Sequence, residues 1–148
     1  MLVAHVIEYI QSQTKAESNH IPLAYFYCAR TINEPERSDP VELMRSILEQ
    51  LSCSDADLPI RLPVVKRYLL KKKEAKARKP EKLDLSECVE VILELLETNP
   101  AFIIIDGLDE CNPARRQDLL DALGEIIKES CNVVQVFVSS RDDHDLVQ

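Results

Sequence analysis

The stretch AFIIIDGLDEC, residues 101–111, decides how the rest of the chain is interpreted. Its apolar run, Phe102 followed by three isoleucines, is typical of a strand that is buried on both faces of a parallel sheet. Asp106 ends this run, and Asp109 and Glu110 follow after Gly-Leu. Open parallel α/β sheets bind ligands at the carboxyl ends of their strands, so these carboxylates are predicted to lie at a metal and phosphate site.

Strands and helices alternate on both sides of this stretch. Two further strands are predicted at about 21–28 and 133–139. Helices are predicted at 2–13, 40–51, about 64–78, 87–97 and 114–130. This alternation implies right-handed crossovers and a parallel sheet. We therefore expect an α/β fold that forms one domain over residues 1–148.

Helix starts and apolar stripes support these boundaries. Asp39 with Glu42, and Asp84 with Glu87, have the spacing of capping boxes, and Asn112 precedes the last helix. The positions predicted to face the sheet are Val41, Leu43, Met44, Ile47, Leu48 and Leu51 in one helix and Leu119, Leu120, Leu123, Ile126 and Ile127 in the last. In the first helix Leu2, Val6, Tyr9, Ile10 and Gln13 recur at helical intervals.

The sequence DGLDEC resembles the Walker B segment of P-loop NTPases, in the form found in NACHT-type ATPases of the signal-transduction (STAND) class. Within that class the chain is most similar to the nephrocystin-type N-terminal modules that are common in large fungal receptor-like proteins. The resemblance covers nearly the whole chain. It implies a three-layer P-loop NTPase-like fold in which the three visible strands lie in chain order and the last of them is left as an open edge.

The phosphate loop of such proteins is missing from this sequence. The chain has two glycines, Gly107 and Gly124, and neither begins a GxxxxGK(S/T) motif. The family pattern places that motif directly before Leu2, where this chain has Met1, and the opening helix has no capping residue. We therefore expect the Walker B and sensor 1 portion of a module truncated at both ends, which binds ATP poorly and hydrolyses it negligibly.

The resemblance also implies roles for the residues of DGLDE. Asp106 would hold the hydration shell of Mg²⁺, Glu110 with Asp109 would polarise the attacking water as catalytic residues, and Gly107 would let the backbone pass close to the phosphates. The residues alone allow another interpretation. Asp106 and Asp109 would then bind local amides in a turn, and Asn112 would cap the next helix.

The segment VFVSSR delivers residues 139–141 to the same edge of the sheet. It resembles the sensor 1 motif, in which Arg141 would contact the γ-phosphate of ATP or GTP, because the guanidinium fork matches phosphate oxygens. In the alternative, Arg141 closes the strand and pairs with one of the aspartates that follow, Asp142, Asp143 or Asp145.

The charge is unevenly distributed along the chain. The formal net charge of −8 argues against binding to nucleic acid or to an anionic membrane. Between Lys66 and Lys82, however, nine basic residues stand with two acidic ones. This predicts a basic helix and loop insertion at about 64–82. It is either a solvated surface or a docking surface for an acidic partner.

The cysteine spacing, the lengths of the apolar runs and the N-terminal sequence indicate the cellular location. The five cysteines (28, 53, 88, 111 and 131) form no CxxC pair, and no histidine stands at a zinc-like spacing from them. Reduced thiols, mostly in or near the core, are expected. No apolar run approaches the length of a membrane span, and the N-terminus lacks the pattern of a secretory signal. A cytoplasmic location is therefore expected.

These features are compatible with three functions. The leading one is a fragment of a nucleotide-binding signal-transduction switch, for which the resemblance implies ATP or GTP, Mg²⁺, self-association and C-terminal repeat domains in a full-length protein. The second is a non-catalytic regulatory protein that pairs with full-length relatives through its open sheet edge or basic segment. The third, a metal-dependent phosphohydrolase using Asp106, Asp109 and Glu110, is disfavoured because no histidine lies near them.

Overall fold

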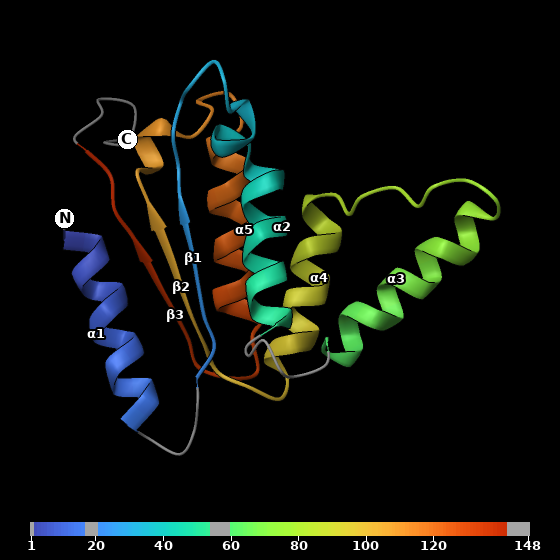
Figure 1. Cartoon of the computed structure of the whole chain (residues 1–148), viewed down its shortest axis with the longest axis horizontal. Coiled ribbons are helices and arrows are strands. Elements are labelled where there is room, and N and C mark those ends of the chain that lie inside the picture. Colours follow the sequence, from blue (N-terminus) through green and yellow to red (C-terminus); the bar gives the residue numbers. More distant parts are fainter. Residues whose placement is uncertain (1, 17–20, 54–59, 142–148) are drawn as a thin grey trace.

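The computed structural model describes residues 2–16, 21–53 and 60–141. Its elements in chain order are α1 (Leu2–Ala16), β1 (Leu23–Tyr27), the 3₁₀ turn η1 (Pro35–Ser38), α2 (Pro40–Ser52), α3 (Leu62–Ala75), α4 (Leu85–Leu96), β2 (Ala101–Asp106), the 3₁₀ turn η2 (Leu108–Glu110), α5 (Arg116–Glu129) and β3 (Val134–Val138). The strands form one parallel sheet in the order β1-β2-β3 (Figure 1). The predicted α/β fold and the order of the three strands are confirmed.

The sheet is covered on both faces. Helix α1 lies on one face, and α2, α4 and α5 cover the other (Figure 1). The three isoleucines of β2 alternate between these layers, because Ile104 packs with Val3 and Ile7 of α1, whereas Ile103 and Ile105 belong to the larger core. All three are at most 1% exposed. This two-sided burial explains why the sequence of the strand shows no polar alternation.

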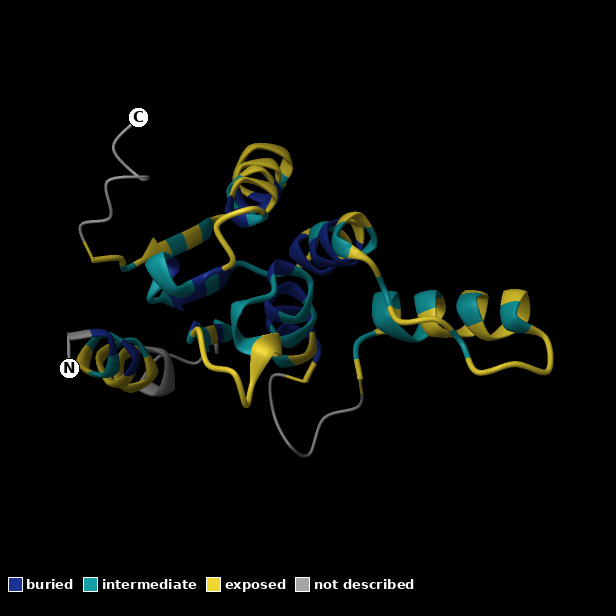
Figure 2. Ribbon diagram, turned by 90° about the horizontal axis from the view of Figure 1, so that it is seen from above, coloured by how far each residue is buried: buried dark blue, intermediate teal, exposed yellow. Residues whose placement is uncertain are grey.

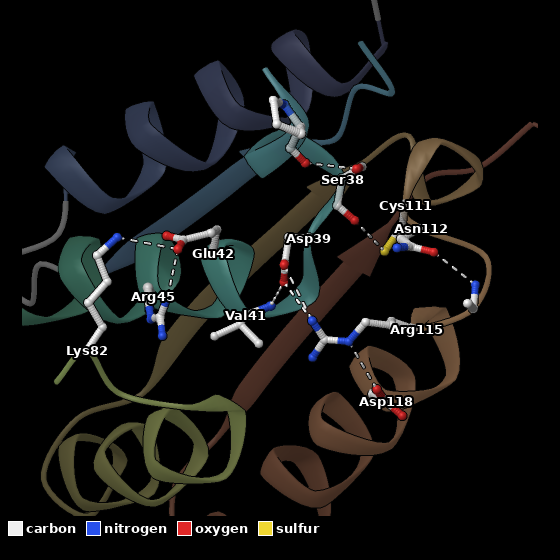
Figure 3. A network of polar contacts seen from close by, with 12 residues as sticks. Ser38, Asp39, Val41, Glu42, Arg45, Lys82, Cys111, Asn112, Arg115 and Asp118 are labelled. Carbon is white, nitrogen blue, oxygen red and sulfur yellow. Dashed lines mark hydrogen bonds and ion pairs between the residues drawn. The ribbon is translucent and has the colours of Figure 1, made fainter. Parts of the chain in front are cut away.

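The N-terminal cap of α4 agrees with the sequence prediction, whereas that of α2 differs from it in part. Asp84 and Glu87 form a complete capping box at the start of α4. Asp39 caps α2 by accepting a hydrogen bond from the Val41 amide at 2.7 Å. The capping box predicted there is wrong. Glu42 instead pairs with Arg45 and Lys82 (Figure 3), and the Asp39 amide that it would have bound donates to the Glu36 carbonyl at 3.2 Å.

The apolar stripe of α5 is rotated relative to the prediction. Leu119, Leu123 and Ile126 are buried as expected, but Ile127 is 54% exposed. Leu120 is only half-buried and lies at the margin of the core. Ala122 is buried as well, so the face of α5 that packs against the core consists of residues 119, 122, 123 and 126. In α2 the prediction holds, except that Val41 is only half-buried.

Helix α1 is also rotated. Its buried residues are Val3 and Ile7, whereas Val6 and Ile10 are half-buried and Tyr9 is 65% exposed. The helix therefore touches the sheet along an edge of the predicted stripe. The other edge lines an apolar groove of about 530 Å³ that runs between α1 and the last two strands.

The two edges of the sheet differ. At the outer edge of β1, the Gln50 side chain accepts from the Tyr25 amide at 3.0 Å and donates to the Tyr25 carbonyl at 2.8 Å. Within the described residues, β3 pairs only with β2, and its Phe137 and Val138 are more than one-third exposed. The open edge expected at the third strand is therefore present.

Helix α3 stands apart from the body of the domain and packs mainly against α4 (Figure 2). It begins and ends a few residues before the predicted bounds and contains no buried residue. Its inner side is held by two ion pairs, Arg67 with Glu90 at 2.7 Å and Lys71 with Glu87 at 2.6 Å. The predicted basic insertion thus contains a helix that is attached through these ion pairs and through Val64, which packs against the main core.

Three of the five cysteines lie in the core. Cys28, Cys88 and Cys111 are buried, Cys53 and Cys131 are exposed, and all five are free thiols. Among the described residues, no helix combines the length and the apolar character that a bilayer span requires.

Candidate functional site

The end of β2 is joined to the segment that follows β3. The Ser139 hydroxyl donates a hydrogen bond to Asp106 Oδ1 and accepts one from the Gly107 amide at 3.2 Å. The backbone of Ser139 also donates to the Ile105 carbonyl and accepts from the Leu108 amide, both at 2.9 Å. Asp106 is therefore held at the carboxyl edge of the sheet, as the sequence predicted, with a hydroxyl as its neighbour.

Gly107 turns the chain out of the strand. Its φ of 76° and ψ of 46° lie in the left-handed region, which glycine adopts without the steric cost that other residues meet. A Cβ atom at this position would lie 3.3 Å from the Cys28 carbonyl oxygen. The glycine is thus required by the turn itself. Its predicted approach to phosphates stays a prediction.

Asp109, Glu110 and Arg141 form a cluster that we name the carboxylate clamp. The Arg141 amide and Nε donate to the two oxygens of Asp109 at 3.1 and 3.0 Å, and its Nη2 pairs with Glu110. The side chains of Asp109 and Glu110 are 12% and 31% exposed, whereas that of Arg141 is 78% exposed. Asp109 therefore binds a residue 32 positions away as well as its own turn. The alternative partners predicted for Arg141, namely Asp142, Asp143 and Asp145, lie outside the described residues.

The clamp changes the acidity of Asp109. Burial alone would raise the pKa of this carboxyl, but hydrogen bonds from the Arg141 amide and from its own backbone, with the charge of Arg141, hold the pKa below its ordinary value. The ion pairs of so exposed an arginine contribute only about 0–1 kcal/mol. Arg141 can thus leave the carboxylates at little energetic cost.

Two further arginines, which the sequence did not single out, support the turn η2. Arg30 Nη2 donates to the carbonyls of Asp109 and Cys111 at 3.0 and 3.1 Å, and its amide donates to Glu110 Oε2 at 3.3 Å. Buried Arg116 also donates to the Asp109 carbonyl at 3.0 Å. The position of Arg30 just after β1, at the same carboxyl edge, was the signal that could have revealed it.

The chain that leaves the site is anchored to the start of α2 (Figure 3). The Asn112 amide donates to the Ser38 carbonyl at 2.9 Å, and Cys111 Sγ lies 3.5 Å from the same oxygen. Arg115 Nη1 binds the capping residue Asp39 at 3.2 Å. Asn112 Oδ1 accepts from the Ala114 amide in the turn before α5, but the N-cap of α5 is Arg115, which makes no side-chain cap, so the predicted capping of this helix by Asn112 is wrong. The turn is thus fixed at both ends.

Two oxygen-bearing side chains, Asp106 and Ser139, lie together at this edge. Within the described residues, no group of three His, Cys, Asp or Glu side chains is arranged to hold a metal ion. Mg²⁺ keeps several waters, however, and is commonly bound by one or two carboxylates together with the phosphates of a substrate. Asp106 and the Ser139 hydroxyl offer such a partial set of oxygens.

The comparison with protein families bears directly on this arrangement. The model of the nephrocystin 3 N-terminal family matches residues 1–141. The chain belongs to this family. The match extends from α1 to Arg141 and includes every predicted site residue, namely Asp106, Gly107, Asp109, Glu110 and Arg141. The nephrocystin-type resemblance inferred from DGLDEC is confirmed. No curated protein and no solved structure matches the chain.

Proposed function

We propose that the chain is the Walker B and sensor 1 portion of a NACHT-like nucleotide-binding switch module. One observation carries the proposal. At the carboxyl edge of a parallel sheet, Asp109 and Glu110, which follow β2, bind Arg141, which follows β3, and Asp106, which ends β2, binds Ser139. Ligands of open α/β sheets bind at that edge, and carboxylates with an arginine suit a nucleotide phosphate and its Mg²⁺.

Each residue has a role in this proposal. Asp106 and Ser139 bind the water shell of Mg²⁺, which neutralises charge on the phosphates when it is bound with the nucleotide. Glu110 orients the attacking water and Asp109 supports it. Arg141, whose ion pairs with Asp109 and Glu110 are weak, releases these carboxylates and binds the γ-phosphate. This exchange makes Arg141 the element that distinguishes a nucleoside triphosphate from a diphosphate.

The sequence holds no GxxxxGK(S/T) motif, whose amides and lysine supply much of the phosphate recognition. We therefore expect weak nucleotide binding and negligible hydrolysis by this polypeptide alone. The open edge of β3 and the apolar groove beside it are where the strand that carries a phosphate loop would pair.

The test is reconstitution of the nucleotide site. The coding sequence upstream of Met1 is translated, and any apolar strand with GxxxxGK(S/T) is expressed in frame with the chain. We expect Mg²⁺-dependent ATP or GTP hydrolysis that disappears with Glu110→Gln and persists with Glu94→Gln, an exposed carboxylate on α4. An extended polypeptide that binds no nucleotide, or that hydrolyses it equally well with Glu110→Gln, would refute the proposal.

The asymmetry of the sheet edges favours a second candidate function. Gln50 blocks the edge of β1, whereas β3 is open, so a non-catalytic regulator could pair with a full-length relative through β3. If no phosphate loop is encoded upstream, this role becomes the better supported one. Hydrogen exchange then distinguishes the two, because pairing protects the amides of β3 when a relative is added, without any need for nucleotide.

A further inference from the structure

Helix α3 has a solvent-facing stripe that its packing on α4 does not use. Leu62, Lys66, Leu69 and Lys73 recur at intervals of four, three and four residues, which places them on one side of the helix. All four are exposed, with Leu62 at 63% and Leu69 at 56%. The ion pairs with α4 come from the opposite side, through Arg67 and Lys71. The stripe therefore alternates apolar and basic residues on an exposed side of α3.

Helix α5 carries a stripe of the opposite charge. Asp118, Asp121, Glu125 and Glu129 recur at intervals of three, four and four residues, and all four are exposed. Beside them lies Gly124, where an added Cβ would meet nothing within 4 Å. The local partners of these acids, such as Arg115 with Asp118 at 3.5 Å, are solvent-exposed pairs that exchange at little cost.

The two stripes match in length and spacing. Both helices have 14 residues and are therefore about 21 Å long. Lys66 and Lys73 stand seven residues apart, as do Asp118 and Glu125, so the charges repeat every two turns on each helix. The segment from Lys66 to Lys82 is strongly basic whereas the rest of the chain is acidic, so one copy is complementary to another.

We propose that the outer stripe of α3 docks on the acidic stripe of α5 in a second copy of this chain. The contact is heterologous, because each copy contributes a different helix to it. A pair of helices this short buries less than a standard interface, so the association is weak and depends on salt. The proposal does not depend on the nucleotide site, and its failure leaves that proposal untouched.

The test uses two charge-reversal variants of the whole chain. The first carries Lys66→Glu with Lys73→Glu, and the second carries Asp121→Lys with Glu125→Lys. Sedimentation velocity of the wild type at low salt is expected to show association that rises with concentration and weakens at high salt. Each variant alone is expected to associate at least about tenfold more weakly, because like charges then face each other.

Mixing the two variants is the decisive step. The acidic α3 of the first then meets the basic α5 of the second, and the other two stripes are native, so association is expected to return to nearly the wild-type level. Both variants keep a net negative charge, so overall attraction cannot explain the recovery. Arg78→Glu with Lys79→Glu, which makes the same charge change in the loop after α3, is the matched control and is expected to associate as the wild type does.

Three results would overturn the proposal. One is a wild type that stays monomeric at all concentrations and salt levels. Another is a mixture that associates no better than either variant. The third is a monomer that instead pellets with phosphatidylserine vesicles in a manner abolished by the first variant, which would assign α3 to a membrane surface. If charge reversal unfolds α3, as circular dichroism would reveal, Lys66→Ala with Lys73→Ala retains helix propensity and is expected to weaken association of the chain with itself, and unchanged association would overturn the proposal.

Discussion

Replacing Gly107 by alanine tests the geometry of the turn that positions the candidate site. The residue has a φ of 76°, and an alanine there pays about 1–2 kcal/mol for the left-handed conformation. Its Cβ would lie 3.3 Å from the Cys28 carbonyl oxygen, a backbone atom that cannot rotate away, so the neighbouring strand must shift slightly as well. We expect a destabilisation of about 1–2 kcal/mol, which lowers the melting temperature by about 2–8 °C in a domain of this size.

The other glycine of the sequence, Gly124, allows the same glycine-to-alanine substitution as a matched control. Gly124 lies within α5, and a Cβ there meets no atom within 4 Å. Gly124→Ala is therefore expected to stabilise the protein by up to about 1 kcal/mol through helix propensity. Thermal melts followed by circular dichroism, with urea unfolding for the free energies, should show shifts of opposite sign.

Gly107→Asn adds an intermediate point, since asparagine tolerates the left-handed region better than alanine does. Its destabilisation is expected to be smaller than that of Gly107→Ala. If Gly107→Ala were neutral or stabilising, the turn at the end of β2 would not have the conformation described, and the placement of Asp109 and Glu110 would lose its basis.

Three other predictions concern charges, caps and thiols. Because the pKa of Asp109 is lowered in the folded state, its ionised form stabilises the fold above the ordinary carboxyl pKa of about 3.9, and this contribution is lost as the pH falls through the lower, folded pKa. Arg141→Gln should therefore raise the pKa of Asp109, as a carboxyl-carbon NMR titration would measure, and an unchanged pKa would contradict the clamp. Asp84→Ala removes the capping box of α4 and should cost about 1–2 kcal/mol in urea unfolding, whereas no loss would show that the cap is unimportant. Burial raises the pKa of the Cys28 thiol to about 12, so iodoacetamide at pH 8 should alkylate exposed Cys53 and leave Cys28 intact in mass spectra of the native protein, and equal labelling would count against the described core.

The elements that could be predicted from the sequence are those in which one local pattern decides the structure. Strand β2 was predicted at its observed bounds, because a run buried on both faces and ended by a carboxylate has few other interpretations. The capping box of Asp84 and Glu87 was correct for a similar reason, since both partners lie within one turn.

The features that were missed depend on contacts between distant segments. Glu42 had the spacing of a capping-box residue, but its carboxylate binds Arg45 at 2.6 Å and, from 40 positions away, Lys82 at 3.5 Å, while the Asp39 amide donates to Glu36. Ile127 fitted the helical period, yet the angle at which α5 packs left it in solvent. Arg30 went unnoticed because its partners are the carbonyls of η2, which carry no side-chain signature.

For the candidate site, the sequence placed Asp106, Asp109, Glu110 and Arg141 at one edge of the sheet, and the structure brings them together there. The direct engagement of both carboxylates by Arg141 was not predicted. It arises because the residues after β3 lie beside the turn η2, where the Ser139 carbonyl accepts from the Leu108 amide and the Arg141 amide donates to Asp109. This proximity exists only once the strands have assembled into the sheet.

The most direct test of the nucleotide proposal is an amide NMR titration of Mg·ATP into the ¹⁵N-labelled chain fused to an N-terminal strand that carries a GxxxxGK(S/T) motif. We predict Mg²⁺-dependent shifts that cluster at residues 106–110 and 139–141, with the Arg141 amide among the largest because its hydrogen bond to Asp109 is exchanged. Shifts that are confined to other elements, such as α3, or a spectrum unchanged by the nucleotide, would contradict the assignment of this edge as a nucleotide site.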